Sequence, residues 1–131
     1  MEEWRPVKDF EGVYEVSNFG RVRSLPRVII RKNGKPFTRK GQIMTLTPTY
    51  QNRYMDKFHY FIVCLNWGEK NIRNKLMSVH RLVAEAFVPN PQNLSSVNHI
   101  NSDRRDNHAV NLEWVTHQEN INHYKGRGVS I

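Results

Sequence analysis

The stretch SVNHIN at residues 96–101, followed by NLEWVTHQEN at residues 111–120, determines how the C-terminal part of this chain is expected to fold. Residues 97–100 and 112–115 have the composition of two short strands. The intervening residues 101–108 are rich in turn-forming side chains. We therefore expect two neighbouring strands joined by an ordered loop.

A short helix is predicted directly after the second strand. Thr116 is a suitable N-cap, and Glu119 lies three residues further on, which makes a capping box. The helix should cover about residues 117–124. Because it follows the strand pair so closely, this helix can pack across the pair and bring its first turn beside the first strand.

Four polar side chains of this unit can form one site. Asn98 and Asn120 each offer an amide oxygen, a ligand that suits a hard cation such as Mg²⁺, and would leave most coordination positions to water and phosphate. The neutral imidazole of His99 can take a proton from water. Asn111 can tie the loop through amide hydrogen bonds. A structural interpretation stays open here, because asparagines are common in turns and a single strand histidine usually only packs.

An amphipathic helix is predicted before this unit. Val79, Leu82, Val83, Ala86 and Phe87 fall on one helical face. Ser78 is a suitable N-cap and Pro89 a suitable stop.

The N-terminal part has the alternation of short strands and turns. Residues 13–17 and 21–25 predict a β-hairpin, and a second hairpin is predicted where Asn33 and Gly34 follow an apolar run. Residues 43–47 alternate as a third strand that Pro48 should end, and residues 60–65 form an apolar strand. Several short strands in succession indicate an antiparallel sheet and an α+β fold class.

The composition argues against a membrane protein, a secreted protein and a cysteine zinc protein. No apolar run of about 18 residues is present, so no membrane span is predicted. The acidic start MEEWRP does not resemble a secretory signal. The single cysteine, Cys64, excludes an intrachain disulfide and a cysteine zinc cluster, and we expect it to be a buried thiol in a reducing compartment, a cytoplasm.

The positive charge is concentrated in the N-terminal part. The net charge is +8, and residues 1–78 hold 15 Lys and Arg against 7 Asp and Glu, whereas residues 79–131 hold 5 of each. This distribution predicts a polyanionic partner, nucleic acid, although a basic face kept only for solubility is the simpler alternative. The predicted DNA-binding side chains in this part are Arg21, Arg23, Arg27, Arg31, Lys32, Lys35, Arg39 and Lys40. Arg81, Arg104 and Arg105 of the C-terminal part are predicted to clamp phosphates near the candidate site.

Two segments of the chain resemble known families. Residues 79–91 (VHRLVAEAFVPNP), together with VNHI at 97–100, Asn107, NLEWVT at 111–116 and Glu119-Asn120, resemble the HNH homing-type endonucleases of phages and mobile introns. Residues 4–7 and 10–25 resemble a nuclease-associated modular motif that often precedes such domains.

The resemblance implies a ββα-metal (His-Me finger) fold with one divalent ion, Mg²⁺ or Mn²⁺. It implies that His99 is the general base, that Asn98 and Asn120 are the metal ligands, and that Asn111 fixes the loop. Asn98 departs from the carboxylate or histidine common in HNH enzymes, and a neutral amide should hold the cation more loosely.

The predicted organisation follows from both resemblances. Residues 1–77 are expected to form a basic, β-rich DNA-binding region, residues 78–124 the nuclease domain and residues 125–131 a tail. We expect a metal-dependent endonuclease of double-stranded DNA, a monomer that nicks or a dimer that cuts both strands, acting in the cytoplasm of a bacterial host if a phage encodes it. The alternatives are a DNA-binding protein with a weak or inactive site and, more remotely, an RNA-binding module.

Overall fold

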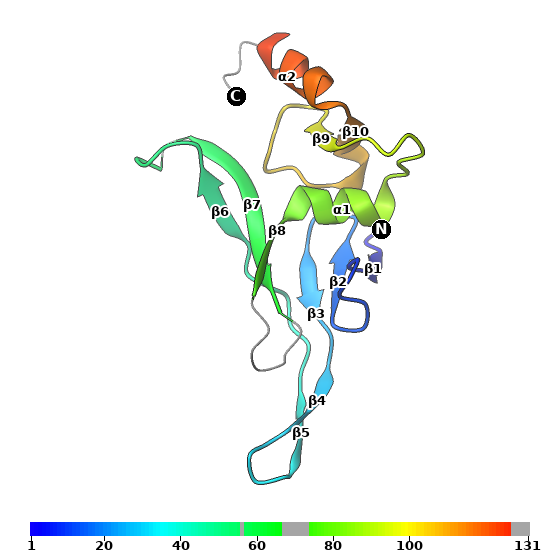
Figure 1. Cartoon of the computed structure of the whole chain (residues 1–131), viewed down its shortest axis with the longest axis vertical. Helices are drawn as coiled ribbons and strands as arrows, with labels where there is room; N and C mark the ends of the chain where they lie inside the picture. Colours follow the sequence, from blue (N-terminus) through cyan, green and yellow to red (C-terminus); the bar gives the residue numbers. More distant parts are fainter. Residues whose placement is uncertain (56, 67–73, 127–131) are drawn as a thin grey trace.

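Small antiparallel sheets and two α-helices make up the part of the chain that the structure, a computed structural model, describes, namely residues 1–55, 57–66 and 74–126. The sheets are β1-β2-β3, β4-β5, β6-β7-β8 and β9-β10 (Figure 1). The elements are β1 (Trp4–Pro6), β2 (Tyr14–Ser17), β3 (Val22–Ser24), β4 (Arg27–Ile30), β5 (Pro36–Arg39), β6 (Thr47–Tyr50), β7 (Phe58–Leu65), β8 (Lys75–Ser78), α1 (Val79–Phe87), β9 (Ser96–His99), the 3-10 turn η1 (Ala109–Asn111), β10 (Leu112–Val115) and α2 (His117–Gly126).

The first predicted hairpin is confirmed as β2 and β3. Val16 lies opposite Val22, and both side chains are fully buried. The connecting turn contains Gly20 at a φ of 90°, a backbone conformation that side chains other than glycine rarely adopt. Ser17 holds the turn, because its hydroxyl accepts hydrogen bonds from the backbone N–H groups of Phe19 and Arg21.

The second predicted hairpin is confirmed as β4 and β5. Ile29 lies opposite Phe37, and the turn between the strands contains Gly34 at a φ of 80°. Figure 1 shows this hairpin extending away from the rest of the molecule. Every side chain of β5 is exposed, so the hairpin contributes little to the core.

The strand predicted over residues 43–47 is wrong in its position. Ile43 makes only an isolated bridge with Arg23, and the strand of this region is β6, four residues further on. Pro48 lies inside β6 instead of ending it. β6 is the edge strand of its sheet, where a residue without a backbone N–H is tolerated, and the Thr49 hydroxyl is hydrogen-bonded to the backbone of Tyr60 at 2.8 and 3.2 Å.

The burial predicted for Cys64 is also wrong. Cys64 is exposed and lies opposite the exposed Leu76 in β8. Its neighbours Val63 and Leu65 are the buried residues, because successive side chains of a strand point to opposite faces. The composition of residues 66–71 predicts a turn after the strand at 60–65, and this segment lies almost entirely outside the described residues.

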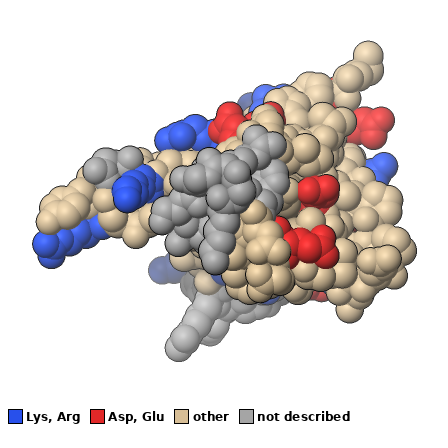
Figure 2. Space-filling model, turned by 90° about the horizontal axis from the view of Figure 1, so that it is seen from above, with Lys and Arg blue, Asp and Glu red and all other residues tan. Residues whose placement is uncertain are grey.

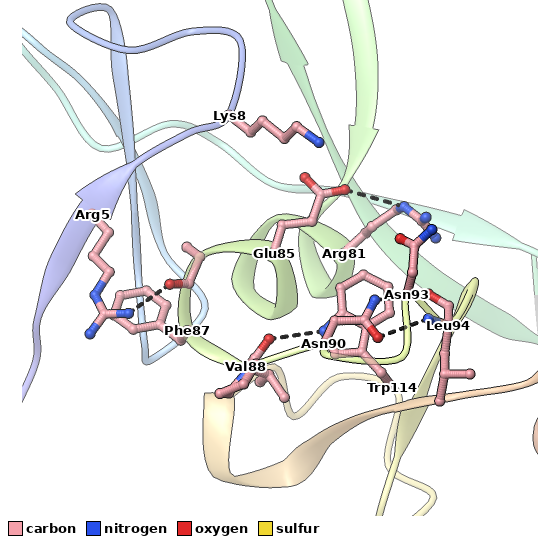
Figure 3. A pocket seen from close by; sticks show the side chains of 12 residues that line it. Arg5, Lys8, Arg81, Glu85, Phe87, Val88, Asn90, Asn93, Leu94 and Trp114 are labelled. Carbon is pink, nitrogen blue, oxygen red and sulfur yellow. Dashed lines mark hydrogen bonds and ion pairs between the residues drawn. The ribbon is translucent and has the colours of Figure 1, made fainter.

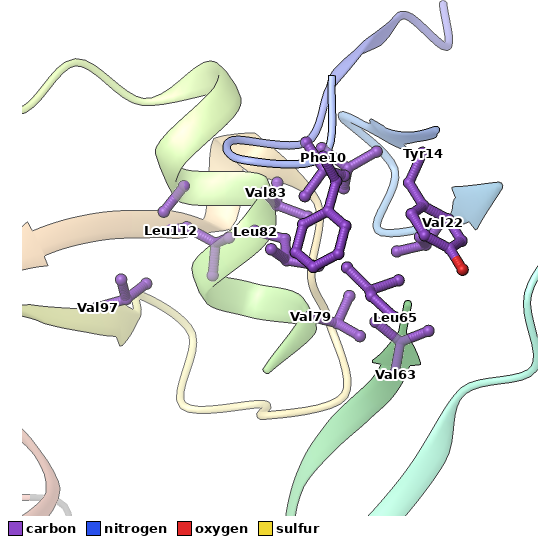
Figure 4. Close-up of a cluster of buried hydrophobic side chains, with 13 residues drawn as sticks. Phe10, Tyr14, Val22, Val63, Leu65, Val79, Leu82, Val83, Val97 and Leu112 are labelled. Carbon is purple, nitrogen blue, oxygen red and sulfur yellow. The ribbon is translucent and has the colours of Figure 1, made fainter. Parts of the chain in front are cut away.

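The predicted amphipathic helix is α1, and it lies at the centre of the core. Its buried residues are Val79, Leu82, Val83 and Ala84. They pack with side chains of the N-terminal part, Phe10, Tyr14 and Val22, with Val63 and Leu65 of β7, and with Val97 and Leu112 of the C-terminal unit (Figure 4). One hydrophobic core therefore joins the two regions, residues 1–77 and 78–124, that the sequence analysis predicts as separate parts of the chain.

The C-terminal unit has the predicted order of two strands and a helix. β9 and β10 pair with His99 opposite Leu112 and Asn98 opposite Glu113. The capping box is confirmed, since the Glu119 backbone N–H donates to the Thr116 hydroxyl at 3.1 Å. α2 contacts β9. Among the described residues, no helix is long and apolar enough to cross a lipid bilayer.

Candidate active site between strand β9 and helix α2

Asn98 lies at the centre of β9 and is almost completely buried. Its amide nitrogen donates a hydrogen bond of 2.7 Å to a carboxylate oxygen of Glu113, its cross-strand neighbour. Its amide oxygen is also buried and has no hydrogen-bond partner in the protein. A buried carbonyl oxygen without a partner is costly, so this oxygen needs a ligand from outside the chain.

Asn120, in the first turns of α2, presents a second such oxygen. The amide oxygen of Asn120 is buried and lacks a hydrogen-bond partner, as in Asn98. The helix that carries it contacts the strand that carries Asn98. Among the described residues, no three His, Cys, Asp or Glu side chains are grouped to hold a metal ion. Amide oxygens suit a hard cation that keeps several water or phosphate ligands, and Asn98 and Asn120 each offer one.

His99 is buried and lines one pocket with Asn120, whereas Asn98 does not line that pocket. Its Nε2 atom lies 2.8 Å from the amide oxygen of Asn107, which is also buried. Burial lowers the pKa of the His99 imidazole below its ordinary value of 6.5. The hydrogen bond to Asn107 works in the opposite direction, and the nearby Arg104 adds to the lowering. His99 is therefore neutral near pH 7, the state in which an imidazole can accept a proton.

A second histidine, His80, lies next to His99 at the start of α1. The centroids of the two rings are 5.1 Å apart. Burial, followed by the charges of His99 and Arg81, lowers the pKa of His80 to about 3. Its Nδ1 atom is buried without a hydrogen-bond partner. The His80 ring also packs against the ring of Tyr60 in β7, with centroids 5.5 Å apart.

One pocket brings together side chains from five parts of the chain. His99 and Asn120 line it, together with Arg104 of the loop between β9 and η1. The remaining lining residues are His59, Tyr60, His80, Val97 and His117. The contribution of His59 and Tyr60 was not foreseen, because β7 is remote in sequence and no local pattern indicates that it borders this site.

Asn111 lies under the loop that carries Arg104. Its side-chain amide donates to the Asn101 side chain at 3.0 Å and to the Asp106 backbone carbonyl at 2.9 Å, and its side-chain oxygen accepts from the Asn101 backbone N–H at 3.0 Å. The Asn111 backbone carbonyl also accepts from Ile100 at 2.8 Å. These bonds tie both ends of the loop, while the catalytic role predicted for Asn111 stays a prediction.

The β4-β5 hairpin presents most of the predicted DNA-binding side chains. The exposed ones are Arg31, Lys32, Lys35, Arg39 and Lys40, whereas Arg27 is half-buried. No acidic residue occurs between Glu15 and Asp56, so the hairpin has no carboxylate of its own. Figure 2 shows the molecule from above, where the part projecting to the left, which carries Lys and Arg side chains, is the end of β6 and β7 seen at the left of Figure 1, and most visible Asp and Glu side chains lie over the body.

Several other predicted DNA-binding residues are engaged within the protein. Arg21 is paired with Glu2, and Arg23 is paired with Glu15 at 2.6 Å. Both guanidinium groups lie over the Trp4 ring.

Arg81 lies in a different pocket from His99. Its Nε atom pairs with Glu85 at 3.4 Å, and an Nη atom donates to the Ser95 carbonyl at 2.9 Å. Figure 3 shows this pocket, which Arg5, Lys8 and Trp114 also line. Arg105 lies elsewhere, 3.9 Å above the Phe58 ring. The structure therefore places only Arg104, of the three arginines predicted near the cut, in the pocket of His99.

Comparisons with known proteins match this arrangement. The NUMOD4 motif matches residues 2–66, and an HNH endonuclease family model matches residues 78–121. An uncharacterised HNH endonuclease of Acanthamoeba polyphaga mimivirus is 38% identical over 128 residues, which cover 93% of this chain and 26% of the mimivirus protein. The DNA endonuclease I-HmuI of Bacillus phage SP01 is 34% identical over 126 residues, which cover 96% of this chain and 59% of I-HmuI. The chain thus spans between a quarter and three fifths of the length of these relatives.

A solved structure of I-HmuI has the same fold. It concerns DNA binding and cleavage by that HNH homing endonuclease, and it matches this chain with a TM-score of 0.62 and 28% identity over 98% of this chain and 61% of I-HmuI. The resemblances stated from the sequence and the α+β fold with a C-terminal ββα unit are thereby confirmed.

Proposed function

We propose that this chain, whose residues 78–121 match an HNH endonuclease family model, is a divalent-metal-dependent endonuclease that nicks or cuts double-stranded DNA. The observation that carries this proposal is the buried, unpartnered amide oxygen of Asn120 in the pocket of the neutral, buried His99, with a second such oxygen on Asn98, the residue before His99. A cation, a water molecule and a phosphate are the groups that such a site accommodates.

His99 is the general base in this proposal. Its ring takes a proton from a water molecule, and the water oxygen forms a bond to phosphorus while the bond from phosphorus to the 3′ oxygen breaks. The products are a 5′-phosphate and a 3′-hydroxyl, whose proton comes from solvent. His99 then returns its proton to solvent, which it does readily because burial lowers its pKa.

Asn98 and Asn120 are the proposed ligands of the cation, Mg²⁺ or Mn²⁺. When bound, the ion supplies Lewis-acid stabilisation of the negative charge that develops on the leaving 3′ oxygen. Glu113 orients Asn98, because its carboxylate holds the amide nitrogen and so turns the amide oxygen away from itself. Arg104 lines the same pocket, and we propose that its guanidinium contacts a phosphate oxygen.

Binding of the duplex is proposed to rest on the β4-β5 hairpin. Two-stranded ribbons of this kind fit the major groove, and most of the cationic side chains on the hairpin are expected to contact phosphates and not bases. DNA binding and cleavage are named for I-HmuI and are properties of that protein. The match to I-HmuI covers 96% of this chain and so includes both the NUMOD4 region and the HNH region.

The test is the nicking of supercoiled plasmid with Mg²⁺ or Mn²⁺. We expect conversion to the open circle by a monomer, no conversion in EDTA, and a loss of about 10²- to 10⁴-fold in rate for His99→Ala with unchanged DNA binding. Nicking that persists at the same rate in His99→Ala would reject His99 as the base. A duplex competitor that fails to displace the protein from RNA would reject DNA as the partner.

A second candidate function is DNA binding with little or no cleavage. The observation that favours it is Asn98 itself, since a neutral amide binds a cation more weakly than a carboxylate does. Tight plasmid binding without nicking in either metal would support this candidate. The setting that we propose for either function is the cytoplasm of a bacterial host, by analogy with the phage origin of I-HmuI.

A further inference from the structure

Asn107 is a buried polar residue that the family assignment gives no role. We propose that Asn107 is a positioning residue that holds the His99 ring with its hydrogen on Nε2, which leaves the Nδ1 lone pair to take the proton from water. This inference rests on the proposed function, because it concerns how the general base is prepared.

The contact between the two side chains defines the tautomer. The amide oxygen of Asn107 lies 2.8 Å from Nε2 of His99, and the two residues are 4% and 3% exposed. An amide oxygen can only accept a hydrogen bond, so Nε2 must be the donor. A neutral imidazole carries one N–H, and Nδ1 is therefore the nitrogen with a free lone pair. The other tautomer would place two lone pairs against each other in a buried site.

The backbone around Asn107 is fixed on both sides. The carbonyl of Asp106 accepts a hydrogen bond of 2.9 Å from the Asn111 side chain. Two residues after Asn107, the backbone N–H of Ala109 donates to the carbonyl of Asn18 at 2.8 Å. Asn107 thus presents its side chain to His99 from a loop segment that is anchored to η1 and to the β2-β3 turn.

The N-terminal region supports Asn107 directly. A Cβ atom added at Gly20 would lie 2.9 Å from the Cβ of Asn107 and 3.2 Å from its carbonyl oxygen. Beside this contact, the rings of Phe19 and His108 pack with centroids 5.1 Å apart. The turn of the NUMOD4 region is therefore packed against the residue that contacts the base, and the site depends on a part of the chain outside the HNH match.

The first experiment observes the tautomer directly in the full chain. The protein is labelled with ¹⁵N-histidine, and long-range ¹H–¹⁵N NMR spectra of the imidazoles are recorded at mildly alkaline pH, with His99→Gln used to assign the His99 signals. We expect a protonated Nε2 and an unprotonated Nδ1. A protonated Nδ1 in the wild-type protein would overturn the inference, and this result needs no Asn107 variant that folds.

Two matched variants then distinguish a positioning role of Asn107 from a role in packing alone. Asn107→Leu has a similar shape but no acceptor, whereas Asn107→Asp keeps an acceptor oxygen at the same place. We expect mixed tautomers in Asn107→Leu and the wild-type tautomer in Asn107→Asp. If Asn107→Leu kept the wild-type tautomer while melting normally, the inference would fail.

Single-turnover nicking provides the second readout. Asn107→Leu should lower the cleavage rate constant by about 10- to 100-fold, in the range of other residues that orient a reacting group, with the Kd for DNA unchanged. Asn107→Asp should recover most of the rate. An equal loss in both variants would indicate packing alone and overturn the inference. If the wild-type protein does not nick DNA at all, the proposed function fails, while the NMR result still decides the role of Asn107.

Discussion

Asn98 combines two requirements in one side chain. Its oxygen is available for a cation, and its nitrogen is bonded to Glu113. A carboxylate at this position would hold a cation more firmly, but it would also face the carboxylate of Glu113 across the two strands. The amide is therefore compatible with a stable strand pair when no cation is bound, at the cost of weaker metal binding.

The variant Asn98→Asp tests this balance. In EDTA we expect it to lower the free energy of unfolding by about 1–2 kcal/mol, because the hydrogen bond to Glu113 is lost and two carboxylates become neighbours. Adding Mg²⁺ should recover stability and lower the metal concentration needed for nicking, since a ligand that binds the folded state stabilises it. Thermal unfolding with and without Mg²⁺ measures the first effect, and metal titration of nicking the second. The double variant with Glu113→Gln serves as control and should melt normally in EDTA.

His80 makes the stability of the fold depend on pH. Its folded-state pKa of about 3 lies below the ordinary value of 6.5, so between these values the unfolded chain binds a proton that the folded chain does not. The free energy of unfolding should therefore fall as the pH decreases from 6.5 toward 3. His80→Phe, which keeps a buried ring without a titrating group, should give a shallower decrease in urea unfolding at successive pH values. Some dependence should remain, because the pKa values of His59 and His99 are lowered as well. Parallel curves for the two proteins would contradict the assignment to His80.

The β4-β5 hairpin is the element through which we expect DNA affinity to be changed without disturbing the candidate site. Its side chains contribute little to the core. The hairpin contains no Asp or Glu, so no carboxylate within it pairs with the Lys and Arg side chains at its tip. Arg21 and Arg23 of the neighbouring sheet differ, since Glu2 and Glu15 already neutralise them. Charges of the same sign on two adjacent elements should thus contribute unequally to phosphate binding.

Replacing Lys32 and Lys35 with Gln should weaken DNA binding and reduce its salt dependence. Each phosphate contact that is lost should lower the slope of log K against log salt concentration by about 0.9. The matched control replaces Arg21 and Arg23 with Gln, and there we expect a smaller change. Fluorescence anisotropy of a labelled duplex over a series of salt concentrations measures both slopes. A larger change in the control pair would show that the N-terminal sheet, and not the hairpin, carries the phosphate contacts.

Elements whose determinants are local in sequence were predictable, and the others were not. The hairpins around Gly20 and Gly34, the capping box of α2 and the pairing of β9 with β10 depend on neighbouring residues. The position of β6 depends on its partner β7, which alternation and the breaker Pro48 do not reveal. In the same way, the contact between His99 and Asn107 follows from the geometry of a loop, and spacing alone does not fix it.

At the scale of the whole molecule, one core joins the NUMOD4 and HNH matches. Val79, Leu82 and Val83 of α1 are at most 2% exposed, and part of what covers them comes from residues 1–65. The predicted boundary near residue 77 separates two candidate roles, DNA binding and cleavage, but it does not separate two cores. We therefore expect the HNH unit to depend on the preceding region for folding as well as for the proposed binding of DNA.

A fragment that begins at Ser78 should therefore not fold alone. It would expose the face of α1 that packs against Phe10, Val22 and Leu65, and a chain of this length already buries too little apolar surface for independent stability. We expect no cooperative thermal transition by circular dichroism and no nicking from the fragment. Mixing it with residues 1–77 should restore both signals, because the two pieces then rebuild the shared core. A fragment that unfolded cooperatively and nicked plasmid by itself would instead show that the HNH unit is autonomous, and that the contacts of Gly20 with Asn107 serve only to attach the N-terminal region.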